Sequence, residues 1–215
     1  MLWIYYLFIL FIILYFYFSF YKENLTNMNN KQIVLLGDSI LENSPYANPS
    51  IFEILQNSSY SVFCFAKDNS TIDSTYLQIY DIPSNLNNRN TFLFVSVGGN
   101  DILQKYVYKD IQSDKHKNMD KIFEEYKSLI LSLQKKMDLS NIFLLNIYYP
   151  TSDYYKSYYH LIKEWNESLK KFCLEKNFKC LNIAEFMTSE KDFSFDIEPS
   201  SIGSKKISDA ILKSI

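Results

Sequence analysis

Short apolar runs alternate with longer amphipathic stretches over residues 32–215. Short runs of branched aliphatic and aromatic residues are typical of buried strands, and they occur at 32–36, 60–66, 91–97, 141–147 and 178–183. Apolar residues at helical spacing predict helices between and after these strands, at about 49–56, 72–83, 118–137, 153–175 and 200–214. Strands that alternate with helices form a parallel sheet covered on both faces. The pattern therefore predicts one α/β domain, a three-layer α/β/α sandwich with a five-stranded parallel sheet.

The first 21 residues have a different pattern, because Ser19 alone interrupts their apolar and aromatic character. About twenty apolar residues are enough to cross a bilayer as one helix. Ser19 stands between two phenylalanines, which makes a poor signal-peptidase site. We therefore predict an uncleaved, single-pass transmembrane anchor at 1–21 and a polar linker at 22–31; the alternative is a helix buried in the core. Lys22 and Lys31 follow the segment and no Lys or Arg precedes it, which favours a cytoplasmic position for the soluble domain.

Composition excludes several classes of function. The net charge is −2, and no basic patch of the kind that binds nucleic acid is present. The chain has three cysteines, Cys64, Cys173 and Cys180, and none has metal-ligand spacing to a second Cys or His. An odd number of cysteines without a framework argues against disulfides, so we expect them to pack as small core residues. The sequence predicts neither a cofactor nor a metal, and it gives no indication of an oligomeric state.

Polar residues follow three of the predicted strands. Gly37-Asp38-Ser39 ends the first strand, Asn69 follows the second, and Gly98-Gly99-Asn100-Asp101 ends the third. Right-handed crossovers place the carboxyl ends of parallel strands at one edge of the sheet, where ligands bind in open α/β folds. A Ser hydroxyl needs a neighbouring base to act as a nucleophile, and its reaction needs fixed donors for the developing oxyanion. The simpler alternatives to a catalytic role are structural. Asp38 and Ser39 are typical helix N-cap residues, and Asn100 is typical of a loop position with a left-handed backbone.

These motifs resemble those of the SGNH (GDSL) hydrolases, a family of serine esterases and lipases with a flavodoxin-like α/β/α sandwich. The resemblance covers about 32–215 and includes Pro199-Ser200-Ser201-Ile202-Gly203, which is similar to the segment after the family's catalytic His. It implies that Ser39 is the nucleophile and that the Asn100 side chain donates to the oxyanion. It also implies a third donor, the backbone N–H of Asn69, which stands where the family has a Gly.

The last motif departs from the family. The family has Asp-x-x-His-Pro, whereas this chain has Phe195-Asp196-Ile197-Glu198-Pro199, so that Glu198 stands in the His position and Phe195 in the Asp position. The Ile-Glu-Pro-Ser run resembles that of a subgroup of SGNH-like sequences. We interpret Glu198 as a substitute base, and we expect Phe195 to raise its pKa by desolvation, with Asp196 adding to the effect. The alternative is that Glu198 only favours a helix N-terminus and that the site has lost hydrolase chemistry.

The two histidines do not offer a better base. His116 lies in a Lys-rich loop and His160 lies in a predicted helix, and neither follows a strand. The sequence therefore predicts a membrane-anchored serine hydrolase that acts on a carboxylic ester or an O-acyl group of a small substrate. The alternatives are a catalytically inactive SGNH-like scaffold that binds a glycan, an acyl ligand or a protein, and an unrelated α/β domain with chance motifs.

Overall fold

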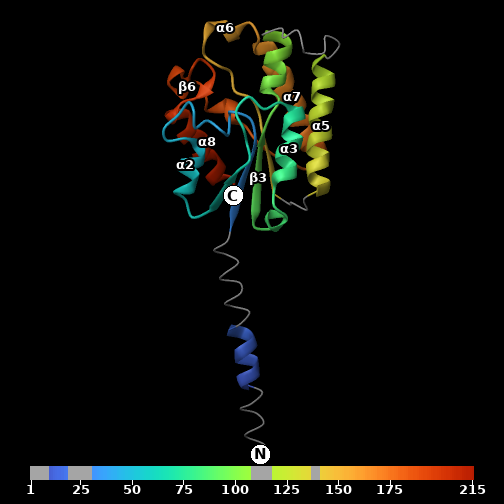
Figure 1. The fold of residues 1–215 in the computed structure, drawn as a ribbon, viewed down its shortest axis with the longest axis vertical. Coiled ribbons are helices and arrows are strands. Elements are labelled where there is room, and N and C mark those ends of the chain that lie inside the picture. The colour runs from blue at the N-terminus through green and yellow to red at the C-terminus, as the bar shows by residue number, and fades with distance from the viewer. Residues whose placement is uncertain (1–9, 19–30, 108–117, 137–140) are drawn as a thin grey trace, which may run out of the picture.

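Parallel strands form the central sheet of the domain (Figure 1). There are five of them, in the order β2-β1-β3-β4-β5. The computed structural model describes residues 10–18, 31–107, 118–136 and 141–215. The strands are β1 Gln32–Gly37, β2 Ser61–Cys64, β3 Thr91–Ser96, β4 Ile142–Leu145 and β5 Lys179–Leu181. Each falls within one residue of a predicted run or inside it, so the predicted five-stranded parallel sheet is confirmed.

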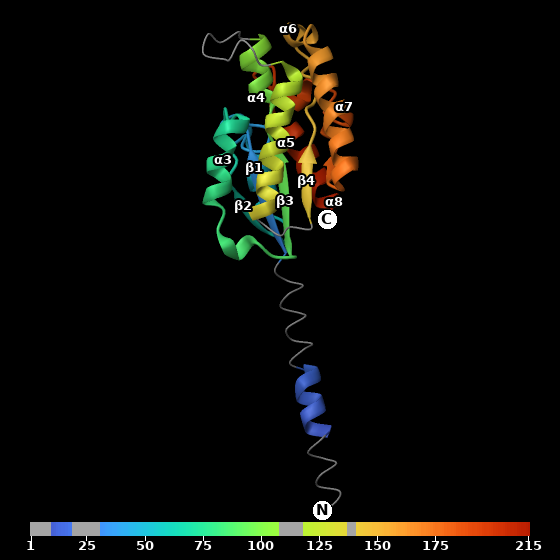
Figure 2. The same cartoon turned by 90° about the vertical axis from the view of Figure 1, so that its right-hand side faces the viewer.

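Helices cover both faces of the sheet, as the three-layer prediction requires. On one face lie α3 (Ile72–Asp81), α5 (Met119–Lys136) and α7 (Tyr159–Lys176), and on the other lie α2 (Ile51–Gln56) and α8 (Ser201–Lys213) (Figures 1 and 2). Strand β1 supplies both layers, because consecutive side chains of a strand point to opposite faces. Val34 and Leu36 pack against α3, α5 and α7, whereas Ile33 and Leu35 pack against α2 and α8. This double burial explains why β1 is continuously apolar.

Three features differ from the predicted elements. The helix predicted at 153–175 is two helices, α6 (Asp153–Lys156) and α7, because the chain leaves helical geometry at Tyr158, where φ is −101° and ψ is 2°. A short helix α4 (Gly99–Ile102) continues into the π-helical turn η2 (Leu103–Val107) directly after the third strand. A two-stranded hairpin, β6 (Phe193–Ser194) with β7 (Glu198–Pro199), precedes α8. Both of the added elements border the candidate site.

The prediction that the cysteines form no disulfide is wrong for one pair. Cys173 on α7 and Cys180 on β5 form a disulfide, with their Cα atoms 6.2 Å apart. Asn177 ends α7 in the left-handed conformation, and this reversal returns the chain alongside the helix within seven residues. The odd number of cysteines gave no sign of this local pair. Cys64 is free and half-buried on the edge strand β2.

Little of the predicted membrane anchor lies within the described residues. Residues 10–18 are helical and exposed, whereas 1–9 and 19–21, like residues 22–30 of the predicted linker, lie outside the described part. Among the helices that the structure describes, none combines the length and the apolar character needed to cross a bilayer. The anchor at 1–21, the linker at 22–31 and the boundary at 32 stay predictions.

Candidate active site

Ser39 lies in a sharp turn at the carboxyl end of β1. Gly37 has a φ of +126°, and a Cβ atom there would lie 1.6 Å from the Ser96 carbonyl oxygen, so only glycine fits. The turn is held by two bonds, in which the Asp38 N–H donates to the Ser96 carbonyl at 2.8 Å and the Glu42 N–H donates to the Asp38 carbonyl at 3.0 Å. Strand order reverses at β1, because the chain places β2 on one side of β1 and then returns to place β3 on the other side. Ser39 therefore occupies the switch point at which open α/β sheets bind ligands.

Glu198 reaches Ser39 from the β6–β7 hairpin. Ser39 and Glu198 line the same pocket, and the interaction of the Ser39 hydroxyl with the ionised carboxylate lowers the pKa of Glu198. Two contacts fix the backbone on either side of Glu198. The Tyr148 hydroxyl donates to the Ile197 carbonyl at 2.7 Å, and the Asn43 amide donates to the Pro199 carbonyl at 3.1 Å. The two residues that the sequence predicted as nucleophile and base thus lie in the same pocket.

The environment of Glu198 favours its protonated form. Burial raises its pKa to about 7, the negative charge of Asp68 adds to the rise, and the hydrogen bond from Ser39 opposes it. The second carboxylate oxygen, Oε2, is buried without a hydrogen-bond partner. A carboxylate with a pKa near neutrality is suited to accept and return a proton at physiological pH.

The cause expected for this rise in pKa is wrong. Phe195 is 76% exposed and packs edge-on against Tyr46 at a centroid distance of 5.8 Å, outside the pocket around Glu198. Phe195 and Asp196 form the tip of the hairpin with φ values of 48° and 71°, which directs both residues into solvent. Glu198 is instead desolvated by its own burial beside Ile197 and Tyr148, which line the same pocket.

A second buried carboxyl lies beside the first. Burial, with smaller contributions from the charges of Glu198 and Asp101, raises the pKa of Asp38 to about 8, although bonds from the Ile40 N–H and the Ser96 hydroxyl oppose the rise. The two bonds measure 3.2 and 3.1 Å and end on the same oxygen, Oδ1. Asp38 therefore carries its proton at neutral pH, which limits the repulsion between the two carboxyl groups. The sequence suggested only a helix cap at this position.

Asn100 is brought to the same pocket as Ser39 and Glu198. Its amide donates to the Ser70 carbonyl at 2.9 Å. An amide carries two N–H donors, so one remains for a ligand in the pocket. Gly98 precedes it with a φ of +115°, and a Cβ there would lie 2.3 Å from the Trp165 ring. This close packing fixes the start of α4 and, with it, the position of Asn100.

Asn69 is arranged differently from the other predicted site residues. Its φ of 59° agrees with the expected unusual backbone. Its N–H, however, donates to the Asp68 carboxylate at 2.8 Å, and its side-chain amide donates to the same carboxylate at 2.9 Å. Asn69 also does not belong to the described residues that line the pocket. The structure thus brings Ser39, Asn100 and Glu198 together, with the N–H of Asn69 already occupied.

One supporting residue escaped the sequence analysis. The side-chain amide of Asn166, on α7, accepts from the Ile147 N–H at 2.9 Å and donates to the Ile147 carbonyl at 2.7 Å. This pair of bonds fixes the chain after β4, where Ile147 and Tyr148 line the pocket. No sequence signal marks Asn166, because its partner is backbone. His160 is exposed, with Nδ1 3.0 Å from the Ser157 carbonyl oxygen, and His116 lies outside the described residues.

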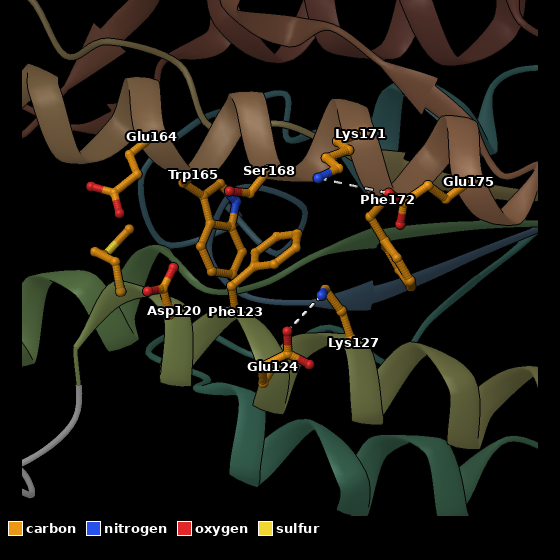
Figure 3. Close-up of a pocket in the computed structure, with 11 residues that line it drawn as sticks. Asp120, Phe123, Glu124, Lys127, Glu164, Trp165, Ser168, Lys171, Phe172 and Glu175 are labelled. Atoms are coloured by element: carbon orange, nitrogen blue, oxygen red, sulfur yellow. Dashed lines mark hydrogen bonds and ion pairs between the residues drawn. The ribbon is translucent and has the colours of Figure 1, made fainter.

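A second hollow of about 240 Å³ lies between α5 and α7 (Figure 3). Phe123 and Trp165 line it together with charged side chains, including the Lys127–Glu124 ion pair at 2.6 Å. None of the four predicted site residues, Ser39, Asn69, Asn100 and Glu198, lines this hollow. No group of three or more His, Cys, Asp or Glu residues able to hold a metal occurs in the part of the chain that the structure describes.

Comparison with known proteins identifies a matching family model and structures with the same fold. The model of the family described as GDSL-like lipase/acylhydrolase matches residues 33–211. No curated protein matches the chain. A lipolytic protein of the G-D-S-L family from Veillonella parvula is 18% identical, with a TM-score of 0.66 over 85% of this chain and 96% of that chain. The acetylxylan esterase Axe2 from Geobacillus stearothermophilus is 15% identical, with a TM-score of 0.67 over 86% and 94%. These structures share the fold of this chain.

Proposed function

Because the chain belongs to the family of GDSL-like lipases and acylhydrolases, we propose that it is a serine hydrolase with Ser39 as nucleophile and Glu198 as general base. The family predicted from the strand-end motifs is confirmed, and with it a hydrolase that acts on ester bonds. The proposed substrate is a small carboxylic ester or an O-acyl group. The observation that carries the proposal is that Ser39, Asn100 and Glu198 line one pocket, in which the Ser39 hydroxyl lowers the raised pKa of Glu198.

The proposed reaction has two steps. Glu198 takes the proton of the Ser39 hydroxyl while the Ser39 oxygen attacks the ester carbonyl carbon. The carbonyl oxygen, now negative, accepts hydrogen bonds from the Ser39 N–H and the Asn100 amide. Glu198 then returns the proton to the leaving alcohol, and an acyl-serine remains. Water attacks the acyl-serine in the same way, with Glu198 again taking and returning a proton, and releases the carboxylic acid.

Glu198 performs in this reaction the task that an imidazole performs in other serine hydrolases. A carboxylate base needs no second acid to hold its ionised form, which is consistent with Phe195 in place of the family's Asp. We also propose the Asn69 N–H as a third oxyanion donor. Its bond to Asp68 means that the turn at 68–69 must adjust before this N–H can reach a substrate.

We further propose that residues 1–21 anchor the enzyme in a membrane through a single helix. The Cys173–Cys180 disulfide favours an oxidising compartment for the folded domain, because cytosolic thiols are kept reduced. We therefore place the domain on the oxidising side, contrary to the orientation that Lys22 and Lys31 favour. Resistance of the full chain to carbonate extraction, and its loss on deletion of 1–21, would support the anchor. Labelling of more than one thiol per unreduced chain would contradict the disulfide.

A fluorophosphonate probe tests the proposed chemistry, because it labels only an activated serine. We expect labelling of the full chain, none in Ser39→Ala, and slow labelling in Glu198→Gln. Ser128→Ala is the matched control, because this serine lies on α5 and only bonds the Glu124 carbonyl at 2.9 Å. A folded protein that neither labels nor cleaves p-nitrophenyl esters between pH 6 and 9 would refute the proposal. The catalytically inactive scaffold would then be the better interpretation.

A further inference from the structure

An apolar pocket continues from the reacting groups into the domain. Ser39, Asn100 and Glu198 line one part of it. The remaining walls come from α4 and η2, from the segment after β4, and from α6 and α7, which gather at the carboxyl end of the sheet (Figure 2). The apolar residues that matter for the argument are Ile102, Leu103, Val107, Ile147 and Ile162.

The walls beyond the reacting groups are mostly apolar and carry no cationic side chain, so they disfavour an anionic or strongly polar ligand part. No Lys, Arg or His occurs among the described residues that line the pocket. The Tyr148 hydroxyl is already bonded to the Ile197 carbonyl, so that its ring is the part that faces a ligand. A sugar or an anion would need several polar partners, whereas hydrocarbon is stabilised by leaving water. The pocket therefore fits an apolar substituent.

Its volume limits the length of that substituent. The cavity measures about 70 Å³. A water molecule in the liquid takes about 30 Å³, and a cavity of about 150 Å³ in another protein binds benzene. The available space thus holds two or three carbon atoms. On the basis of the proposed function, we propose that this pocket binds the hydrocarbon part of a short acyl group, and that butyryl fills it.

The acyl half of the ester fits the pocket better than the alcohol half. The wall formed by Ile102, Leu103 and Val107 follows Asn100 directly in the chain. A carbonyl oxygen bound by the Asn100 amide brings the acyl carbons against this wall. The leaving oxygen must instead lie beside Glu198, from which it receives its proton. The alcohol consequently leaves toward the hairpin and solvent.

A series of p-nitrophenyl esters tests the inference, since the alcohol is constant and only the acyl chain changes. We expect kcat/KM to rise about fourfold for each methylene from acetyl to butyryl, as full burial of a CH₂ predicts. It should fall for hexanoyl and octanoyl esters. Equal rates for acetyl and butyryl esters, or a continued rise to octanoyl, would overturn the inference.

Variants connect this preference to the pocket. Ile162→Ala should move the optimum toward hexanoyl, and the matched control Leu174→Ala, on the same helix and 77% exposed, should leave it at butyryl. Leu103→Trp, at a half-buried position that lines the pocket, should restrict the enzyme to acetyl esters and serves if Ile162→Ala does not fold. Acetyl esters of alcohols of increasing length should show no comparable optimum. An optimum in that second series would assign the pocket to the alcohol and refute the proposal.

Fluorophosphonate labelling distinguishes a failure of the acyl-pocket inference from a failure of the proposed serine hydrolase function. If the protein labels at Ser39 but cleaves acetyl and octanoyl esters equally well, the proposed function is supported and the acyl-pocket inference is refuted. If the folded protein neither labels nor cleaves any ester, both the proposed function and the acyl-pocket inference are refuted.

Discussion

Gln78 binds both backbone groups of Gly37, the residue at the carboxyl end of β1. The Gly37 N–H donates to Oε1 of Gln78 at 2.8 Å, and Nε2 of Gln78 donates to the Gly37 carbonyl at 2.8 Å. Nε2 also donates to the Ser70 hydroxyl at 2.8 Å, and the Ser70 carbonyl accepts from Asn100. One buried amide on α3 therefore connects the turn that carries Ser39 with the loop that supports Asn100.

Replacing this amide by an isosteric carboxylate tests its importance. In Gln78→Glu both donated bonds are lost and a charge is buried, so we expect a destabilisation of about 3 kcal/mol or more at pH 8. The loss should be smaller at pH 5, where the new carboxyl can carry a proton and donate one bond. Urea unfolding at both pH values measures the difference.

Gln56→Glu is the control for this substitution, because Gln56 is exposed at the end of α2. It should change the stability by only a few tenths of a kcal/mol. The positioning role of Gln78 would be refuted by a Gln78→Glu protein with the stability of the unmodified chain and an unchanged rate of fluorophosphonate labelling.

Asn100 is expected to act on the transition state rather than on substrate binding. Asn100→Ala removes a donor aimed at the oxyanion, and loss of one such donor lowers kcat about 10²- to 10³-fold. KM should change little, because the ground-state ester carries no full charge on oxygen. Asn57→Ala is the matched control, since this exposed amide also donates to a carbonyl, that of Glu53, at 3.0 Å. An equal loss in both variants would show that the effect is structural.

The pH dependence of activity shows which neighbour of Glu198 raises its pKa. The base must be ionised, so activity should rise with pH and reach half its maximum near the pKa of Glu198, about 7. Asp68→Asn removes a negative charge that raises this pKa, and we expect the midpoint to move a few tenths of a unit to lower pH.

Phe195→Asn is the companion variant, because asparagine tolerates the φ of 48° at this position. The exposure of Phe195 implies that the midpoint will not move. A shift with Phe195→Asn and none with Asp68→Asn would show that Phe195, and not Asp68, raises the pKa of Glu198. Rates of butyryl ester cleavage from pH 5 to 9 provide the measurement.

The sheet and its reactive edge were predictable because they depend on patterns within short segments. Four consecutive apolar residues before Gly37 can only be buried from both faces, and the parallel order then places Ser39 and Asn100 at one edge. The shared pocket of Ser39 and Glu198 followed from the order of motifs along the chain. The catalytic roles of Ser39, Asn69, Asn100 and Glu198 stay predictions until they are measured.

Features that depend on distant or unusual geometry were not predictable. A bulky residue rarely adopts positive φ, so nothing in the sequence suggested that Phe195 would form the tip of a turn and face solvent. Gln78 looked like an ordinary polar residue of a helix, because its partner Gly37 is 41 residues earlier in the chain. The Cys173–Cys180 bond depends on where α7 ends, which a helical pattern alone does not define.

The raised pKa of Glu198 also predicts how stability varies with pH. Its folded value of about 7 exceeds its ordinary value of 4.5, so the folded protein holds a proton that the unfolded chain has lost between these values. The contribution of this residue to stability is complete below pH 4.5 and is lost as the pH rises to about 7.

Glu198→Gln removes this dependence. The variant should therefore gain stability relative to the unmodified chain as the pH rises from 4 to 8, by up to about 3 kcal/mol. The charge of Glu198 also raises the pKa of Asp38, so the measured difference includes this coupling between the two carboxyl groups. Urea unfolding of the two proteins across this pH range measures the difference, and a difference that stays constant with pH would show that folding does not raise the pKa of Glu198.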